Sequence, residues 1–463
     1  MPDTFGSIAR APRCSCRVNS IILTRSTRRL NSMRARCAEI VLGTAEMRAA
    51  LLWTVVRGVF STLYPVWLQR LIIAHSRHDL PCRGASTEHP TLFVDVTNIA
   101  RHDAGTGIQR VVRSITGALI LDPNGWTVQP IRYVDGAYRH SLWPSSDAEP
   151  GEVMDLRVGD VFLGLDLSFD AVRRQAAMLL ARRRTGARIW FVMYDLLPVS
   201  DPGFFSSKVV ARFDRWLIAT ARVADGYACI SQATAADLRM IMCKRFRIDR
   251  APIISVIPMG VDPTPAGSPE RHRAHVRDAG GPSVLAVGTI EPRKGYSDVL
   301  DAFDLLWARG HNVSLAIVGS PGWKTGTLQR RIKRHPEFGR RLSWSATTDD
   351  TNLVAMYEDA TLLIAASYRE GFGLPILEAT QRSCAVLARD IPVFRENAHL
   401  GLRYFPADAG ADELAASILS ALDCQTSPAT ANVLPSLASW PDTAKALIGL
   451  LEKDRHQPMQ IAS

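Results

Sequence analysis

Short apolar runs alternate with segments of helical spacing from about residue 91 onward. The run at 91–96 precedes a glycine loop and then residues 108–121, whose apolar positions recur with the period of a helix. Further strands are predicted at 161–163, 187–193 and 226–230, and helices at 169–185 and 204–223. Alternation of this kind predicts an α/β fold with a doubly wound parallel sheet.

A second alternating series starts at Ser283, with strands predicted at 283–288, 313–319, 360–367 and 385–388. Between the two series, residues 263–269 contain three prolines and one glycine, which predicts an interdomain linker. Two doubly wound halves place a cleft at the carboxyl ends of their strands, where ligands bind in this architecture.

The pattern divides the chain into four parts. We expect an Arg-rich extension that is amphipathic or partly disordered at 1–90, followed by a first Rossmann-like domain at 91–265. A second Rossmann-like domain at 270–430 and a terminal segment with a helix at 431–463 complete the chain.

The positive charge is concentrated in the extension. Residues 1–90 contain 13 Arg, no Lys and 5 acidic residues, whereas the whole chain has a net charge of +10. The predicted domains are therefore close to neutral, which argues against nucleic-acid binding.

The apolar segment at 49–74 has three interpretations. Arg57, Pro65 and Arg70 interrupt it, so its uncharged stretches are too short to span a bilayer. It predicts an amphipathic helix that makes a peripheral contact with an anionic inner-membrane surface, or a packing helix. A translated leader upstream of a start at Met33 or Met47 is the third interpretation.

The eight cysteines are scattered without zinc-site spacing, which favours free thiols in a reducing compartment. The apolar run at 21–23 is too short for a secretory signal. We expect a cytoplasmic protein, with peripheral attachment to the cytoplasmic membrane face as the alternative.

The segment at 369–379 carries the strongest chemical signal. A buried strand ends before it, Gly371 and Gly373 permit close approach of a ligand, and Pro375 favours the first turn of a helix. The free N–H groups of such a helix bind phosphate or other electron-rich oxygens. Glu370 and Glu378 lie on either side of the helix start; an ordinary strand–helix turn with acidic caps is the alternative.

Together with other segments, this motif resembles the retaining GT-B glycosyltransferases of family 4, also called glycosyl transferases group 1. The resemblance covers about residues 91–450 and rests on six segments: 106–113, 194–198, 287–295, 318–324, 370–378 and 388–396. The segments 106–110 and 322–324 are most similar to bacterial mannosyl- and rhamnosyltransferases that build surface polysaccharides such as O-antigen.

The resemblance implies that the first domain, at 91–265, lies on the acceptor side and that the second, at 270–430, binds the nucleotide sugar. It also implies that the helix of the terminal segment at 431–463 crosses back onto the first domain.

The resemblance assigns roles to individual residues of the second domain. It implies that Glu378 holds the ribose hydroxyls, that Glu370 faces the donor sugar near the reacting centre, and that Arg293 and Lys294 bind the diphosphate. The remaining donor-binding residues lie in the glycine loop and at the start of its helix: Gly371, Phe372, Gly373 and Leu374. Fixed cations would stabilise the departing diphosphate, so the resemblance implies a metal-independent reaction with neither a metal site nor a cofactor.

In the first domain, the resemblance places Gly105 and Gly107 in a loop near the donor phosphates. Arg110 and Arg113 follow, and we expect one of the two, with Arg110 as the candidate, to contact phosphate and the other to be a surface charge. Asp195 occupies a position where many family members have histidine. It is our second catalytic candidate after Glu370, although its role is open between acceptor contact, sugar contact and plain capping.

The expected function is that of a retaining glycosyltransferase that moves mannose from GDP-mannose to a lipid-linked or polysaccharide acceptor. Its expected partners are thus a nucleotide-sugar donor and a glycan acceptor. GDP-rhamnose or a UDP-sugar is the alternative donor. A noncatalytic scaffold that binds nucleotide sugar or glycan is the alternative from another class.

Overall fold

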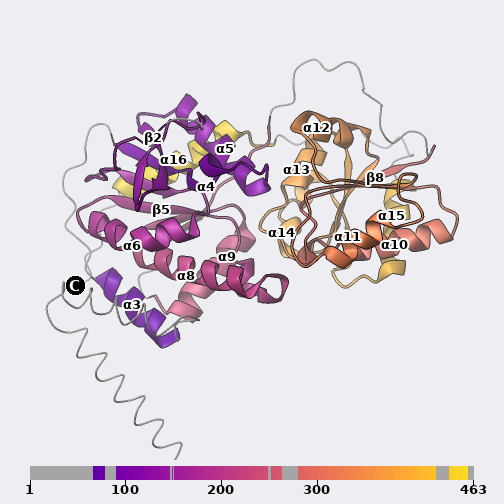
Figure 1. Cartoon of the computed structure of the whole chain (residues 1–463), viewed down its shortest axis with the longest axis horizontal. Helices are drawn as coiled ribbons and strands as arrows, with labels where there is room; N and C mark the ends of the chain where they lie inside the picture. Colours follow the sequence, from indigo (N-terminus) through magenta and orange to yellow (C-terminus); the bar gives the residue numbers. More distant parts are fainter. Residues whose placement is uncertain are drawn as a thin grey trace, which may run out of the picture. The chain divides into compact units, whose positions relative to one another are not determined.

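The computed structural model describes residues 66–78, 90–145, 149, 151–248, 252–262, 280–423 and 437–456 (Figure 1). The predicted linker at 263–269 and the first 65 residues lie outside this part of the chain.

The first domain is built on a seven-stranded sheet with the order β3-β2-β1-β4-β5-β6-β7. Only the β2–β3 pair is antiparallel. The strands are β1 (Thr91–Asp95), β2 (Thr127–Val134), β3 (Ala137–His140), β4 (Val161–Gly164), β5 (Arg188–Met193), β6 (Gly226–Cys229) and β7 (Ile253–Val256). The connections reverse direction between β1 and β4, so the carboxyl edge there is a topological switch point.

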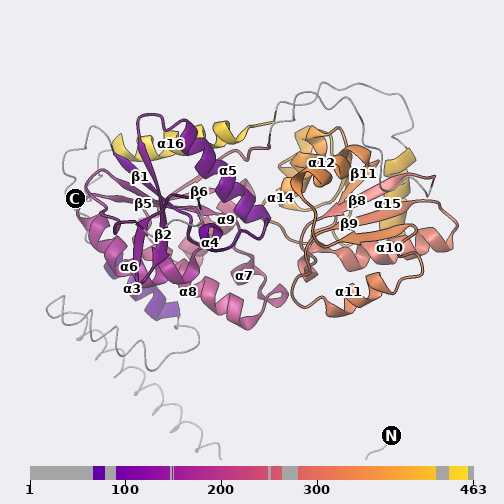
Figure 2. The ribbon, with the colours of Figure 1, turned by 45° about the horizontal axis from the view of Figure 1, so that its top comes forward.

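Helices cover both faces of this sheet (Figure 2). They are α4 (Thr97–Arg101), α5 (Gly107–Leu121), α6 (Phe169–Arg184), α7 (Leu197–Ser200), α8 (Ser207–Val223) and α9 (Gln232–Met240). Thr106 begins α5 with a capping box: its side chain accepts a hydrogen bond from the Gln109 backbone N–H, and the Gln109 side chain binds the Thr106 N–H. The predicted helix at 108–121 is therefore confirmed.

The second domain contains a six-stranded, all-parallel sheet with the order β10-β9-β8-β11-β12-β13. The strands are β8 (Ser283–Val287), β9 (Ser314–Val318), β10 (Leu342–Ser345), β11 (Leu362–Ala365), β12 (Ala385–Arg389) and β13 (Arg403–Phe405). The switch point lies between β8 and β11. Two parallel-strand sheets flanked by helices confirm the predicted fold class.

The second sheet has one apolar core on each of its two faces. One face packs against α10 (Tyr296–Ala308), α11 (Gly326–Lys333) and α15 (Ala411–Asp423). The other face packs against α12 (Asp350–Asp359), α13 (Leu374–Gln381) and α14 (Pro392–Arg395). Helix α13 therefore begins at the carboxyl edge of β11, beside the switch point.

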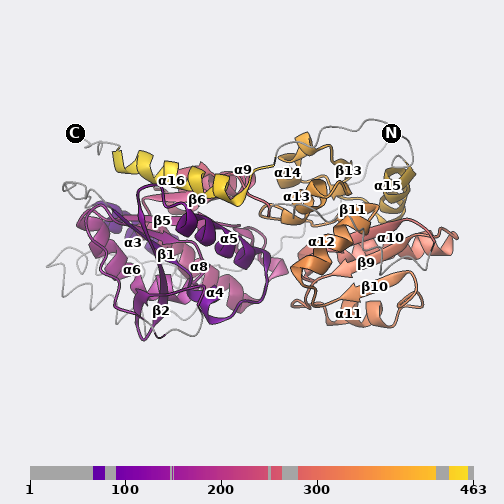
Figure 3. The same cartoon turned by 90° about the horizontal axis from the view of Figure 1, so that it is seen from above.

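The last described helix, α16 (Trp440–His456), packs on the first domain although it follows the second in the chain. It lies alongside α5 (Figure 3). Trp440 is buried, and its indole N–H donates to Asp262 Oδ1 at 2.8 Å. Hydrophobic residues of α16 complete the core over the first sheet.

Helix α3 (Val66–His78) also packs on the first domain, against α8 and the π-helix η2 (Ile241–Phe246). Gln69 and Ile73 are buried there. Residues 66–78 therefore pack on the first domain. The packing-helix interpretation of the segment at 49–74 holds for its part within this helix, although we had placed these residues in the extension at 1–90. Among the described residues, no helix is both long enough and apolar enough to cross a membrane.

Candidate active site

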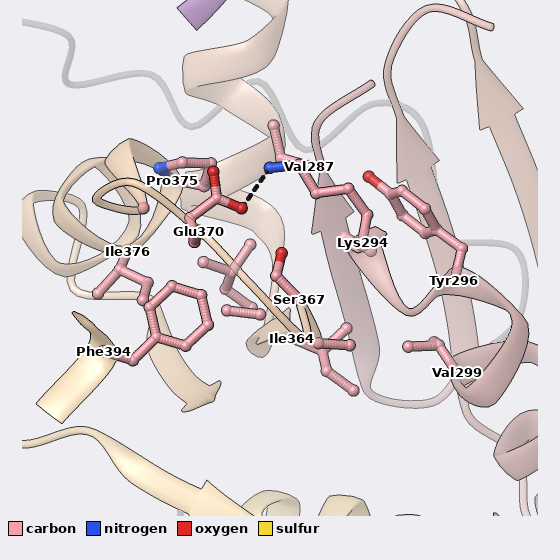
Figure 4. A pocket seen from close by; sticks show the side chains of 15 residues that line it. Val287, Lys294, Tyr296, Val299, Ile364, Ser367, Glu370, Pro375, Ile376 and Phe394 are labelled. Atoms are coloured by element: carbon pink, nitrogen blue, oxygen red, sulfur yellow. Dashed lines mark hydrogen bonds and ion pairs between the residues drawn. The ribbon is translucent and has the colours of Figure 1, made fainter. Parts of the chain in front are cut away.

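Glu370 lies at the centre of a cluster of charges at the carboxyl edge of the second sheet. Its Oε2 accepts hydrogen bonds from Lys294 Nζ at 2.8 Å and from Arg293 Nη1 at 2.9 Å. Figure 4 shows the Lys294 and Glu370 side chains pointing toward each other. The short 3-10 helix at Pro292–Lys294 directs both consecutive cations to one carboxylate.

The charges of this cluster influence one another strongly. Burial raises the pKa of Glu370, but Arg293 and Lys294 outweigh burial and lower the pKa to about 2. Burial opposes the charge of Arg293, whereas Glu370 and Glu291 raise the pKa of its guanidinium above the ordinary value. Both partners are therefore held in their charged forms.

A pocket opens beside this cluster, between β8, β11 and the start of α13. Its polar side chains are Lys294, Tyr296, Ser367 and Glu370, and its apolar floor includes Ile364, Ile376 and Phe394 (Figure 4). The Tyr296 hydroxyl donates to the Gly288 carbonyl at 2.6 Å. A mixed lining of this kind suits a polar ligand with one less polar face.

The glycine loop after Glu370 presents free donors. Within the described residues, the backbone N–H groups of Gly371, Phe372 and Gly373 have no hydrogen-bond acceptor. Gly373 has φ of +102°, and a Cβ there would lie 2.8 Å from the Phe394 ring, so only glycine fits. The loop can therefore donate several hydrogen bonds to the oxygens of a ligand, as the sequence predicted for Gly371 to Leu374.

Glu378 lies one turn inside α13, and each of its carboxylate oxygens has one partner in the protein. It forms an ion pair with Arg110 of α5 and accepts a hydrogen bond from the Tyr357 hydroxyl at 2.7 Å. Arg110 Nη2 also pairs with Asp350 at 2.5 Å. The sequence had assigned Arg110 to phosphate and Glu378 to ribose, and the structure brings these two residues together.

Tyr357 and Asp350 were missed by the sequence analysis. Both belong to α12, and Tyr357 is buried. Neither residue lies in a recognisable motif, and they reach Glu378 and Arg110 only through the packing of α12 beside α13.

The glycine loop of the first domain lies at the start of α5. Gly105 has φ of +64° and open space around it. At Gly107 a Cβ would meet only Leu374 Cδ1, at 3.9 Å, so the protein itself leaves room for a side chain there. Arg113 forms an ion pair with Asp103 and stays partly exposed, which fits the expected surface charge.

Asp195 follows β5 and is half-buried. Its Oδ1 accepts a hydrogen bond from the Leu197 N–H at 3.1 Å, as in the capping interpretation. Burial raises the pKa of its carboxyl, and Arg293 opposes that rise. A Cβ on Gly371 would lie 3.2 Å from Asp195 Cβ, so this carboxylate belongs to the same site as the loop.

The segment at 322–324 contacts the first domain. Trp323 Nε1 donates to the Phe204 carbonyl at 2.7 Å, and Lys324 Nζ donates to the Phe205 carbonyl at 2.8 Å.

Within the described ranges, no group of three or more His, Cys, Asp and Glu side chains is placed to hold a metal ion.

Known proteins resemble both the sequence and the fold. Residues 268–432 match the family described as Glycosyl transferases group 1. The serotype-specific mannosyltransferase WbdA of Escherichia coli is 35% identical over 336 residues, which cover 69% of this chain and 41% of WbdA. The O-antigen chain mannosyltransferase B of Escherichia coli is 32% identical over 143 residues, which cover 30% of this chain and 36% of that protein.

Two solved structures resemble the fold. Sucrose-phosphate synthase from Thermosynechococcus elongatus aligns with a TM-score of 0.57 at 18% identity, over 79% of this chain and 98% of the other. WaaG, a glycosyltransferase involved in lipopolysaccharide biosynthesis, aligns with a TM-score of 0.52 at 14% identity, over 79% of this chain and 98% of WaaG.

These comparisons show which class of protein the chain is similar to. Residues 268–432 match the Glycosyl transferases group 1 family, and the chain has the fold of the GT-B glycosyltransferases. Among its relatives are O-antigen mannosyltransferases, and the chain spans 41% of the length of the WbdA sequence that it matches.

Proposed function

We propose that this protein is a retaining mannosyltransferase that uses GDP-mannose and extends a lipid-linked or polysaccharide acceptor. The observation that carries the proposal is the cluster in which Arg293 and Lys294 converge on Glu370 beside a loop of free backbone N–H groups. The mannosyltransferase names of its relatives support the choice of sugar.

The donor diphosphate would bind Arg293 and Lys294. Breaking the bond between the anomeric carbon and the diphosphate leaves negative charge on the departing oxygen, and two adjacent cations in a partly buried site stabilise that charge. Arg293 offers a forked donor and Lys294 a mobile point charge. We therefore propose a reaction that needs no metal ion.

Glu370 and the glycine loop would orient the sugar. A carboxylate with a pKa of about 2 stays ionised, so Glu370 can accept hydrogen bonds from sugar hydroxyls while the loop N–H groups donate to sugar oxygens. Glu378 would accept hydrogen bonds from the ribose. In a retaining transfer, the acceptor oxygen ends on the same face of the anomeric carbon that the diphosphate left.

A thermal-shift screen against GDP, UDP, ADP and their common sugar conjugates, with and without EDTA, tests the donor. Binding to the folded state must raise the melting temperature. We expect selective stabilisation by GDP and GDP-mannose that EDTA does not alter. Stabilisation by a UDP-sugar alone would overturn the donor, and loss of the response in EDTA would overturn metal independence.

The stereochemistry and the acceptor need a turnover experiment. Incubation with GDP-mannose and a mannose-terminated oligosaccharide should release GDP and give a product whose anomeric configuration, measured by NMR, matches that of the donor. Nucleotide binding without any transfer would favour the scaffold interpretation.

We also propose peripheral contact with the cytoplasmic membrane face, and co-sedimentation with anionic vesicles tests this contact.

A further inference from the structure

The carbonyl group of Gly371 is held by two hydroxyls of the first domain. Ser231 Oγ lies 2.7 Å from this oxygen and Thr234 Oγ1 lies 3.3 Å from it. Ser231 is 1% exposed and Thr234 is 4% exposed, so the contact is shielded from water. A buried hydroxyl pair thus contacts the backbone of the loop that we assign to the donor sugar.

Ser231 is the N-cap of α9, and the other groups at this helix end are already satisfied. The Thr234 N–H donates to Ser231 Oγ at 3.0 Å. Glu396 of the second domain accepts from the Gln232 N–H at 2.8 Å and from the Ala233 N–H at 2.7 Å. Each hydroxyl has one proton and a second acceptor nearby: Thr234 Oγ1 lies 2.9 Å from Ser231 Oγ, and the Tyr194 carbonyl lies 3.4 Å from Thr234 Oγ1. The Gly371 carbonyl, at 2.7 Å, is the nearer acceptor for the Ser231 hydroxyl.

The contact fixes the orientation of one peptide plane. In a trans peptide, the carbonyl of Gly371 and the N–H of Phe372 point in opposite directions. Holding the carbonyl on α9 therefore turns the Phe372 N–H away from α9. Within the described part of the chain, that N–H has no acceptor, so it is free to bind a ligand.

Close packing reinforces this orientation. A Cβ on Gly371 would lie 2.2 Å from the Tyr194 carbonyl oxygen, so the backbone of the loop rests directly on the end of β5. The loop is thus shaped by groups of both domains, although its residues belong to the second.

We propose that Ser231, assisted by Thr234, is a positioning residue for sugar transfer: its hydroxyl holds the Gly371–Phe372 peptide in the orientation that presents the Phe372 N–H to the donor sugar. This inference rests on the proposed function. It assigns to the first domain a part in shaping the donor site, beyond acceptor binding.

Kinetics of Ser231→Ala test the proposal, with GDP-mannose and a mannose-terminated oligosaccharide as substrates. We expect kcat to fall about tenfold, since misplacing a positioning group costs rate, while Kd for GDP changes by less than about twofold. Ser231→Thr should restore most of kcat because it keeps both the hydroxyl and the cap. Thr234→Val, which leaves Ser231 in place, should lower kcat in the same direction by a smaller factor.

Ser206→Ala is the matched control. Ser206 is also an N-cap serine of the first domain, and its hydroxyl accepts from the Val209 N–H at 3.3 Å. This variant loses a helix cap without touching the loop. If Ser231→Ala and Ser206→Ala share the same kcat, or if Ser231→Thr fails to restore kcat, the positioning role is wrong.

Amide hydrogen exchange over residues 370–377 gives a readout that needs no turnover. Exchange there should be faster in Ser231→Ala and Thr234→Val than in Ser206→Ala. Equal exchange in all three variants would overturn the proposed hold on the loop even if the wild type used another donor. Absence of transfer by the wild type, with exchange altered as expected, would instead overturn the proposed function alone.

Discussion

Arg110 of the first domain is ion-paired with Glu378 of the second. Sequence reasoning had assigned the guanidinium to a phosphate and the carboxylate to a ribose. A ribose that binds Glu378 would compete with Arg110 for this carboxylate, and a displaced Arg110 would be free to pair with the diphosphate. Binding would then exchange an ion pair within the protein for an ion pair with the ligand.

Replacing Arg110 should affect nucleosides and nucleotides in opposite directions. In Arg110→Gln, guanosine no longer competes with the guanidinium for Glu378, so it should bind more tightly. GDP should bind about tenfold more weakly, because a charge-assisted contact to phosphate is lost. Calorimetric titration of guanosine and of GDP measures both affinities, and Arg113→Gln is the control on the same helix. If both affinities change in the same direction, Arg110 does not move from Glu378 to the diphosphate.

Loss of the two cations should abolish tight GDP binding. Arg293→Gln with Lys294→Gln removes two charge-assisted contacts, so we expect GDP affinity to fall by at least about 100-fold. Guanosine affinity should change little. Arg331→Gln, which removes a cation paired with Asp301 and Asp304 in the same domain, is the control. A GDP titration that matches this control would remove the diphosphate role.

Glu370→Gln should destabilise the protein at neutral pH. The pKa of Glu370 is lowered from 4.5 to about 2 in the folded state, so the carboxylate contributes stability above pH 4.5 and loses it as the pH falls toward 2. At pH 7 the loss is on the order of 3 kcal/mol. Urea unfolding between pH 7 and pH 3.5 should show the difference from wild type shrinking with acidity.

The exposed Glu413 supplies the control for removing a carboxylate, as Glu413→Gln. Added GDP should restore part of the stability of Glu370→Gln, because the diphosphate replaces the missing anion beside Arg293 and Lys294. A Glu370→Gln variant as stable as Glu413→Gln at every pH would show that the cluster contributes nothing to folding.

Substitutions at two glycines should distinguish a glycine that the fold requires from a glycine that ligand binding requires. A Cβ on Gly371 collides with the Tyr194 carbonyl, whereas a Cβ on Gly107 meets only an ordinary contact. Gly371→Ala should therefore lower both the melting temperature and kcat. Gly107→Ala should leave stability within about 0.5 kcal/mol of wild type and weaken donor binding if the phosphates approach that backbone. Unchanged KM for the donor would exclude Gly107 from the site.

Much of the fold follows from apolar periodicity. The parallel strands β4 and β11 are continuous apolar runs, β5 is apolar after Arg188, and all three were predicted. Strands β2 and β3 were missed because Pro130 and alternating polar residues obscure them. Their connection carries a usable signal, since Asp135 and Gly136 both have positive φ, as an Asp-Gly hairpin turn requires.

The candidate site could be predicted only where its residues are contiguous. Glu370, Glu378 and the Arg293–Lys294 pair stand in short motifs, and the family resemblance of these motifs implied their roles. Tyr357 and Ser231 act through contacts with residues far away in the sequence, at separations of 21 and 140 residues. A single sequence contains no local signal for such pairs.

The hydrophobic residues that α16 adds to the first domain set an order for its folding. The core of that domain includes Trp440 and Leu447, and the Val261 N–H donates to the Ala438 carbonyl at 3.1 Å. A ribosome makes these residues only after the whole second domain. The first domain can therefore complete its core only after the second domain has been synthesised.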